Sequence, residues 1–175
     1  VLFRSASDAP GMGLRCVAFN CRPCHLLKSC CMSSTSPSAV VAPQALELAV
    51  VVPTFNERAN IAELVRRLGE VLQGVAWEVI FVDDDSPDGT ADIVKRLQTE
   101  FPNRLHLEER TGKLGLGTAY IHGFKWALAK GYEFIFEMDA DFSHAPSDVP
   151  RLLKALETYD QAMGSRYIKG GSTSG

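Results

Sequence analysis

Apolar residues between positions 48 and 164 follow two alternating patterns, short continuous runs and helical repeats. The continuous runs predict buried strands at residues 48–52, 77–82, 105–107, 132–138 and 161–164. Between them, apolar residues recur every three or four positions around residues 61–72, 93–101, 120–128 and 149–156, which predicts helices. Strands that alternate with helices in this way predict an α/β fold of the Rossmann-like kind, with a mainly parallel sheet flanked by helices on both faces.

A polar motif follows each expected strand, and this is where parallel sheets bind their ligands. In chain order the motifs are Pro53-Thr54-Phe55-Asn56-Glu57, residues 83–90, residues 112–119, Asp139-Ala140-Asp141-Phe142-Ser143-His144 and Gly164-Ser165-Arg166-Tyr167. Because the carboxyl ends of parallel strands meet at one edge of a sheet, we expect the motifs to lie close together. Pro53 is expected to end the first strand, since it has no N–H for the ladder.

The fourth expected strand ends in two carboxylates, Asp139 and Asp141, one residue apart. Two acids at the end of a buried strand repel each other unless a cation neutralises them. Carboxylate oxygens are ligands that suit Mg²⁺ or Mn²⁺, and the remaining coordination positions are left to water and substrate phosphates. The pair therefore points towards nucleotide chemistry. The plainer alternative is a turn or a loop cap, in which Asp-x-Asp also occurs.

The other motifs leave alternatives open. Four of the six residues at positions 83–88 are acids, more than a turn and a helix cap need, so we expect a cation or a base and ribose to bind there. The glycines of residues 112–117 predict either phosphate binding at a helix start or close helix–sheet packing. Arg166 is suited to holding a phosphate, although a single arginine also forms surface ion pairs.

Composition divides the chain into parts. Its 175 residues allow one domain with a sizeable core, and the net charge of −3 argues against a general nucleic-acid binder. Residues 1–46 hold all five cysteines and four basic residues against one acid, so we expect a disordered, targeting or non-native extension there. We expect one disulfide-free domain at residues 47–169 and a flexible tail at residues 170–175, where a longer protein has been cut.

Taken in order, the five motifs resemble those of the inverting GT-A glycosyltransferases of family 2. Within that family they are similar to the dolichol-phosphate or polyprenol-phosphate mannose synthases, over about residues 48–169. The resemblance implies the nucleotide-diphospho-sugar transferase fold, truncated at the C-terminus, for the domain at residues 47–169. Phe55 stands where this subgroup usually has tyrosine, a change that keeps a ring for stacking and loses a hydroxyl.

The resemblance also implies roles for individual residues. The residues that bind the donor nucleotide sugar would be Pro53, Phe55, Glu57, Val82, Asp84, Asp139, Ala140, Asp141 and Arg166. Asp139 and Asp141 would hold Mg²⁺ or Mn²⁺ and act through it, with Ser143 as a weak third ligand. Residues 113–119 would shape the donor side of the cleft. No general base is assigned, because the attacking phosphate oxygen of the acceptor is already anionic at neutral pH.

By the same resemblance, the reaction is transfer of mannose from GDP-mannose to dolichyl or polyprenyl phosphate with inversion, which supplies lipid-phosphate mannose for protein glycosylation. The acceptor's phosphate would be held by residues beyond position 175, so the chain alone is expected to bind donor without completing the transfer. The implied location is the cytosolic side of a membrane, the endoplasmic reticulum in a eukaryote or the inner membrane in a bacterium. The sequence leaves open whether a C-terminal anchor or a small membrane-anchoring subunit attaches it.

Two rival classes are weighed against this one. A lipid-phosphate glucosyltransferase would use UDP-glucose in the same donor pocket, and residues 86–90 and 113–119 favour mannose over it. A phosphatase of the haloacid-dehalogenase type also places Asp-x-Asp after a buried strand, with the first Asp as nucleophile. Phe142 and the four other motifs argue against the phosphatase.

Overall fold

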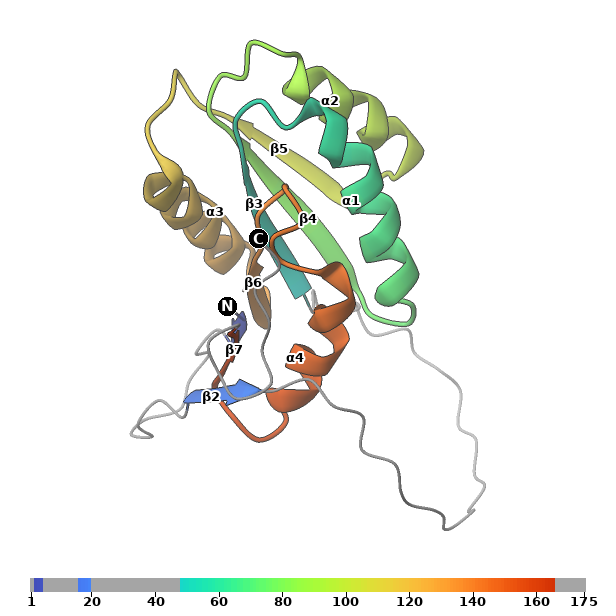
Figure 1. Cartoon of the computed structure of the whole chain (residues 1–175), viewed down its shortest axis with the longest axis vertical. Helices are drawn as coiled ribbons and strands as arrows, with labels where there is room; N and C mark the ends of the chain where they lie inside the picture. The colour runs from blue at the N-terminus through green and yellow to red at the C-terminus, as the bar shows by residue number, and fades with distance from the viewer. Residues whose placement is uncertain (1, 5–15, 20–47, 166–175) are drawn as a thin grey trace.

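The structure, a computed structural model, describes residues 2–4, 16–19 and 48–165 of the chain. These residues form a seven-stranded sheet in the order β2-β7-β1-β6-β3-β4-β5, with helices packed on it (Figure 1). The strands are β1 (Leu2–Arg4), β2 (Cys16–Phe19), β3 (Leu48–Thr54), β4 (Trp77–Asp83), β5 (Leu105–Glu109), β6 (Phe134–Glu137) and β7 (Gln161–Gly164). The helices are α1 (Arg58–Val71), α2 (Thr90–Glu100), α3 (Leu116–Lys130) and α4 (Val149–Ala155), the last preceded by the 3-10 turn Pro146–Asp148.

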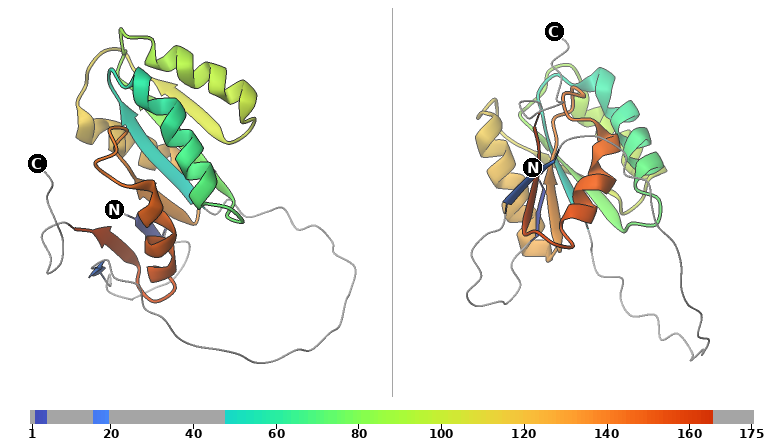
Figure 2. Two further views of the ribbon diagram at one scale, coloured as in Figure 1. Left: turned by 45° about the vertical axis from the view of Figure 1, so that its right-hand side comes forward. Right: turned by 60° about the horizontal axis from the view of Figure 1, so that its bottom comes forward.

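Helices cover both faces of the sheet, as the sequence predicts. Helices α1, α2 and α4 lie on one face, and α3 lies on the other (Figure 2). Successive residues of β3 alternate between two cores, Val50 and Val52 towards α1 and Ala49 and Val51 towards α3. Side chains of a strand point to opposite faces in turn, so a strand covered on both sides needs apolar residues at every position. This is why the strands read as continuous apolar runs.

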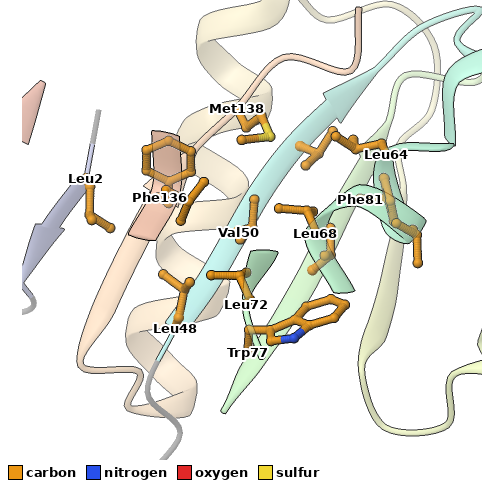
Figure 3. Close-up of a cluster of buried hydrophobic side chains, with 14 of the residues drawn as sticks. Leu2, Leu48, Val50, Leu64, Leu68, Leu72, Trp77, Phe81, Phe136 and Met138 are labelled. Carbon is orange, nitrogen blue, oxygen red and sulfur yellow. The ribbon is translucent and has the colours of Figure 1, made fainter. Parts of the chain in front are cut away.

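The larger core lies between the sheet and α1 (Figure 3). Leu64, Leu68 and the C-capping residue Leu72 follow at helical spacing and are almost completely buried. They pack in one cluster with Val50 of β3 and Trp77 of β4. Burying one leucine side chain contributes about 2 kcal/mol. This apolar stripe therefore fixes α1, and with it the loop before α1, against the sheet.

All five predicted strands and all four predicted helices are confirmed, with one correction at Pro53. This proline does not end β3, which continues to Thr54 with Pro53 opposite Val82 of β4. On its other side β3 pairs with β6 only as far as Val51. Pro53 thus lies in the part of β3 that has a single neighbouring strand, where a missing N–H is tolerated.

Two strands form within residues 1–46, where no element was expected. β1 runs antiparallel between β6 and β7, with Leu2 opposite Phe136 and Ala162, and Leu2 is fully buried. β2 runs parallel to β7. The strands that pair with β1 and β2 lie more than 100 residues further along the chain, so no local pattern of apolar residues predicts the pairing. The expectation of a targeting or non-native extension is not tested by these strands and stays a prediction.

Candidate functional site

The carboxyl ends of β3, β4 and β6 meet at one edge of the sheet. Thr54 and Asp83, which end β3 and β4, are register partners, and the Asp84 N–H donates to the Thr54 carbonyl at 3.0 Å. On the other side of β3, the Met138 N–H donates to the Val51 carbonyl at 3.1 Å. The loops that follow these three strands therefore start side by side.

Side chains that follow β4 accept hydrogen bonds from the backbone of the loop after β3 and so order that loop. The N–H groups of three consecutive residues donate to side chains of the second loop: Asn56 to Ser86 Oγ (3.0 Å), Glu57 to Thr90 Oγ1 (3.0 Å) and Arg58 to Asp88 Oδ2 (3.1 Å). These N–H groups precede or begin α1, where the first turn of a helix has no internal acceptor. The second motif thus caps the helix that follows the first.

Two acids of the second motif, Asp83 and Asp88, accept hydrogen bonds from other groups of the protein. Asp83 is buried and accepts hydrogen bonds from the Thr54 hydroxyl (2.8 Å) and from the N–H and hydroxyl of Ser86 (2.9 and 2.6 Å). Partial burial would raise the pKa of Asp88. The hydrogen bonds from Thr90 and from the Arg58 N–H outweigh burial and lower that pKa below its ordinary value. These two carboxylates thus hold the loops, and the expectation of a cation or of a base and ribose at residues 83–88 stays a prediction.

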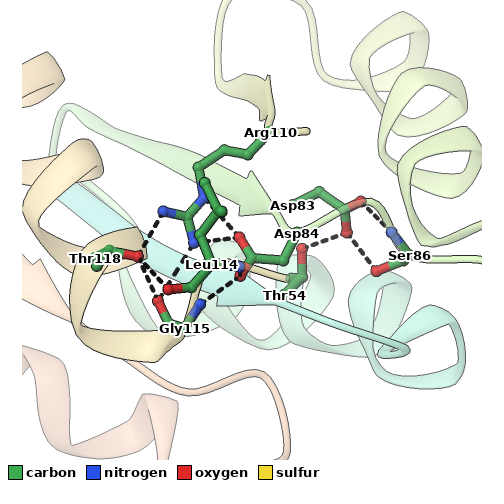
Figure 4. Close-up of polar contacts among 8 residues, drawn as sticks. All are labelled: Thr54, Asp83, Asp84, Ser86, Arg110, Leu114, Gly115 and Thr118. Atoms are coloured by element: carbon green, nitrogen blue, oxygen red, sulfur yellow. Dashed lines mark hydrogen bonds and ion pairs between the residues drawn. The ribbon is translucent and has the colours of Figure 1, made fainter. Parts of the chain in front are cut away.

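The third acid, Asp84, joins the second motif to the glycine-rich segment (Figure 4). Its Oδ1 accepts a hydrogen bond from Nε of Arg110 at 2.6 Å, and its Oδ2 accepts from the N–H groups of Leu114 (3.0 Å) and Gly115 (3.2 Å). Arg110 also donates to the Thr118 hydroxyl at 2.8 Å. The side chains of Asp84 and Arg110 are 5% and 8% exposed. This buried ion pair holds the glycine-rich segment against the end of β4.

Arg110 was not singled out in the sequence, although it stands between the third strand and the glycines. The glycines themselves are not needed for close packing. A Cβ at position 112, 115 or 117 would meet nothing within 4 Å, and Gly112 and Gly115 have φ of +92° and +99°. Such φ values suit glycine, so these two residues allow the chain to turn between β5 and α3.

The glycine-rich segment also reaches the first motif. The ammonium group of Lys113 lies 4.2 Å from the centroid of the Phe55 ring, which is half-buried. A cation over an aromatic face is attracted by the ring's negative potential. The neighbouring Glu57 is also half-buried and accepts a hydrogen bond from Asn60 Nδ2 at 2.7 Å. The ring face of Phe55 is thus in contact with the side chain of Lys113.

The Asp-x-Asp pair follows β6 and is partly exposed. Asp139 Oδ1 accepts a hydrogen bond from the Tyr120 hydroxyl at 2.6 Å, and the Asp139 N–H donates to His144 Nδ1 at 3.1 Å. Asp141 is exposed and its Oδ1 accepts from the Ser143 N–H at 2.9 Å. Hydrogen bonds from Ser143 lower the pKa of Asp141 below its ordinary value, so this carboxylate is charged at neutral pH.

The chemistry of these donors fits a divalent cation held jointly with a substrate. Asp139 and Asp141 supply hard carboxylate oxygens, and the Ser143 hydroxyl lies 3.4 Å from Asp139 Oδ2. Among the described residues, no group of three or more His, Cys, Asp and Glu side chains is gathered as a complete metal cage. Mg²⁺ and Mn²⁺ sites of nucleotide enzymes use one or two carboxylates and complete the coordination with substrate phosphates and water. The pair suits that arrangement and not a closed structural site.

The remaining predicted residues fall into two groups. Pro53, Val82 and Ala140 are buried near the strand ends, and their expected contacts with the donor stay a prediction. Arg166 lies outside the described residues, and its expected contact with phosphates stays a prediction. Tyr120 was placed only in a helix by its sequence pattern, although its hydroxyl contacts Asp139. A tyrosine within an apolar helical stripe gives no local sign of such a contact.

Comparison with known proteins agrees with this architecture. The model of the family described as Glycosyl transferase family 2 matches residues 49–175. The chain is 46% identical over 124 residues to the "Polyprenol monophosphomannose synthase" of Mycolicibacterium smegmatis, covering 70% of this chain and 46% of that protein. It is 43% identical over 126 residues to the "Undecaprenyl-phosphate mannosyltransferase" of Micrococcus luteus, covering 72% of this chain and 51% of that protein.

A solved structure shares the fold: the mannosyltransferase PcManGT of Pyrobaculum calidifontis, in complex with GDP-Man and Mn²⁺. Its TM-score is 0.51 at 30% sequence identity, covering 67% of this chain and 35% of that one. The chain therefore belongs to glycosyl transferase family 2, and its sheet and helices are those of a GT-A glycosyltransferase. Membership of this family excludes the phosphatase alternative.

The chain spans about half the length of the two curated relatives, 46% and 51%. The family match begins at residue 49 and includes all five motifs. No helix among residues 48–165 is long and apolar enough to cross a bilayer.

Proposed function

We propose that this chain binds GDP-mannose with a divalent cation and belongs to an enzyme that transfers mannose to a polyprenyl or dolichyl phosphate. The observation that carries the proposal is the partly exposed pair Asp139 and Asp141 at the sheet edge where the Phe55 and Asp84 loops meet. Relatives at 46% and 43% identity bear the names of lipid-phosphate mannose enzymes. A fold relative solved with GDP-Man and Mn²⁺ supports both the donor and the metal.

In this proposal the nucleotide occupies the edge formed by the first three motifs. The guanine base stacks on the ring of Phe55. It takes the place over the ring that the Lys113 ammonium group occupies in this structure. Asp84 shapes the base pocket through the glycine-rich segment that it holds, and Glu57 lies next to the ribose. The diphosphate then extends towards Asp139 and Asp141, with Arg166 as a further cation for it.

The transfer step builds negative charge on the departing GDP. A divalent cation held by Asp139 and Asp141, either Mg²⁺ or Mn²⁺, would supply Lewis-acid stabilisation of that charge. Once the base has displaced the Lys113 side chain from the Phe55 ring, its ammonium group can move to the diphosphate. There it would add a second positive charge beside the cation. The nucleophile is the phosphate oxygen of the acceptor, which is anionic and needs no general base. The carboxylates of the pair thus act as ligands and not as an acid–base couple.

The acceptor implies a membrane partner. A polyprenyl or dolichyl phosphate resides in a bilayer, so the enzyme works at a membrane surface, on the cytosolic side where nucleotide sugars are available. We place it at the endoplasmic reticulum in a eukaryotic host and at the inner membrane in a bacterial one. Attachment through further chain or through a small anchoring subunit fits this proposal equally well.

Titration of GDP-mannose, GDP and UDP-glucose by calorimetry, with and without Mn²⁺, tests the donor part directly. We expect GDP-mannose to bind in a Mn²⁺-dependent way and more tightly than UDP-glucose. Asp139→Asn and Asp141→Asn should each weaken Mn²⁺-dependent binding at least about tenfold, because each removes one of two charged ligands. Asp85→Asn is the matched control, since Asp85 is an exposed acid of the neighbouring loop. Binding that ignores Mn²⁺, or a preference for UDP-glucose, contradicts the proposal.

A further inference from the structure

The hydroxyl of Tyr120 makes a single well-defined contact with the Asp-x-Asp pair. It donates to Oδ1 of Asp139 at 2.6 Å, from the first turns of α3 to the residues after β6. A hydrogen bond from a neutral hydroxyl to a carboxylate is short and about twice as strong as one between neutral groups. Tyr120 does not belong to the five motifs, and the proposed function above does not use it.

The ring of Tyr120 is held in place by its surroundings. It is partly buried against the core under α3 and stacks on Phe124, one helical turn later, at 5.8 Å between ring centroids. Its neighbour Ala119 is almost fully buried in the same core. The contacts of the ring therefore fix the place from which the Tyr120 hydroxyl donates to Asp139.

This donor acts on one oxygen of Asp139 and leaves the other side of the carboxylate to different groups. Oδ2 lies 3.4 Å from the Ser143 hydroxyl and 3.8 Å from Nδ1 of His144, on the side of the Asp141 loop. The side chain of Asp139 is 33% exposed, and its 2.6 Å bond from Tyr120 is much shorter than its contacts with Ser143 and His144. The bond from Tyr120 selects the orientation in which Oδ2 faces the loop that carries Asp141.

We propose that Tyr120 is a positioning residue that orients the Asp139 carboxylate for a divalent cation. The idea rests on the proposed function, because it assumes that Asp139 is a metal ligand. Groups that hydrogen-bond to a metal ligand fix its orientation, and their loss typically costs about 10–100-fold in metal affinity. The Asp139 N–H donates independently to His144, so loss of the tyrosine hydroxyl would leave the side chain with the longer contacts to Ser143 and His144 and would not release the backbone.

The test compares Tyr120→Phe with Tyr132→Phe. Both substitutions remove one hydroxyl that donates to a carboxylate, since Tyr132 donates to Glu78 near the start of β4. Mn²⁺ affinity is measured by electron paramagnetic resonance in the presence of saturating GDP, and unfolding is followed by circular dichroism. We expect Tyr120→Phe to weaken Mn²⁺ binding about tenfold, and Tyr132→Phe to leave it within about twofold of the wild type. Both variants should lower the unfolding midpoint, because each loses a partly buried hydrogen bond.

Binding of GDP without metal gives a second measurement that a positioning role should not change. Equal Mn²⁺ affinity in the wild type and in Tyr120→Phe would overturn the positioning role and leave the proposed metal site standing. Equal weakening by both variants would also overturn it, since affinity would then follow stability. A wild-type chain that binds no Mn²⁺ with GDP would overturn this inference and the metal part of the proposed function together.

Discussion

Hydrogen-bond partners separate the acids of this chain into those that hold loops and those that face outwards. Asp83, Asp84 and Asp88 accept several bonds each from neighbouring protein groups, so their charge is spent on the loops after β3, β4 and β5. Asp139 and Asp141 accept fewer such bonds, and they are more exposed than the buried Asp83 and Asp84. Residue type alone does not make this distinction, because all five are aspartates at the ends of β4 and β6 or in the loops that follow them.

Asp88 should make a pH-dependent contribution to stability. Its pKa is lower in the folded protein than in the unfolded chain, so its stabilisation is present above the ordinary aspartate pKa near 4 and is lost as the pH falls below that value. We expect Asp88→Asn to lower the free energy of unfolding by about 1 kcal/mol at pH 7. The difference from the wild type should shrink between pH 4 and pH 3, as measured by urea denaturation at each pH.

Asp85→Asn serves as the control for this measurement. Asp85 is exposed and has a positive φ of 58°, a conformation that asparagine also adopts readily. We expect its substitution to leave stability within about 0.5 kcal/mol at every pH. A loss for Asp88→Asn that stays constant from pH 7 to pH 3 would show that its charge is not responsible.

At the scale of elements, α3 is the part that connects the motifs. Its N-terminal end meets Asp84 through Gly115 and Arg110, and its second turn meets Asp139 through Tyr120. The helix has to lie close to the sheet for both contacts, and Gly123 permits this approach. A Cβ at that position would lie 2.2 Å from Cγ1 of Val51 in β3.

Gly123→Ala should therefore destabilise the protein although alanine favours helices. The added methyl group would force α3 away from β3, an overpacking that costs about 1–3 kcal/mol in a dense core. Gly69→Ala in α1 is the matched control, because its Cβ would meet Cζ2 of Trp77 at an ordinary 3.8 Å. That change should stabilise by up to about 1 kcal/mol through helix propensity. Thermal and urea unfolding of both variants check the prediction, and equal effects in the two would contradict it.

On the scale of the whole molecule, the sheet depends on a strand from the other end of the chain. β1 lies between β6 and β7, so it joins β7 and β2 to the part of the sheet that carries the site. Leu2 is fully buried in the larger core together with Phe136. Because the antiparallel strand is only three residues long, its apolar contact matters more than its few ladder bonds.

Leu2→Ala is expected to lower the free energy of unfolding by about 2 kcal/mol or more, as buried leucines do when truncated. The same substitution at Leu128, a leucine of α3 that is 51% exposed, should change it by less than about 0.5 kcal/mol. Urea denaturation of the two variants measures the contrast. An unchanged stability for Leu2→Ala would mean that β1 does not hold the two parts of the sheet together in solution.

The order of strands and helices from residue 48 onwards, and the places of the motifs, follow from the amino-acid pattern alone. Apolar runs and helical repeats are local signals, and a parallel sheet collects its strand ends at one edge whatever the details. For the same reason the pattern points to Asp139 and Asp141, whereas the resemblance to family 2 adds Phe55 and Asp84 to the candidates.

Which side chains meet at that edge depends on the three-dimensional packing. The bond from Tyr120 to Asp139 and the ion pair from Arg110 to Asp84 join residues from different elements, and the pairing of Leu2 with Phe136 crosses most of the chain. Such contacts depend on how helices and strands pack in space, so a periodic pattern of apolar residues does not predict them. That is why the pattern located the carboxylates, and the packing of α3 brought the Tyr120 hydroxyl to one of them, Asp139.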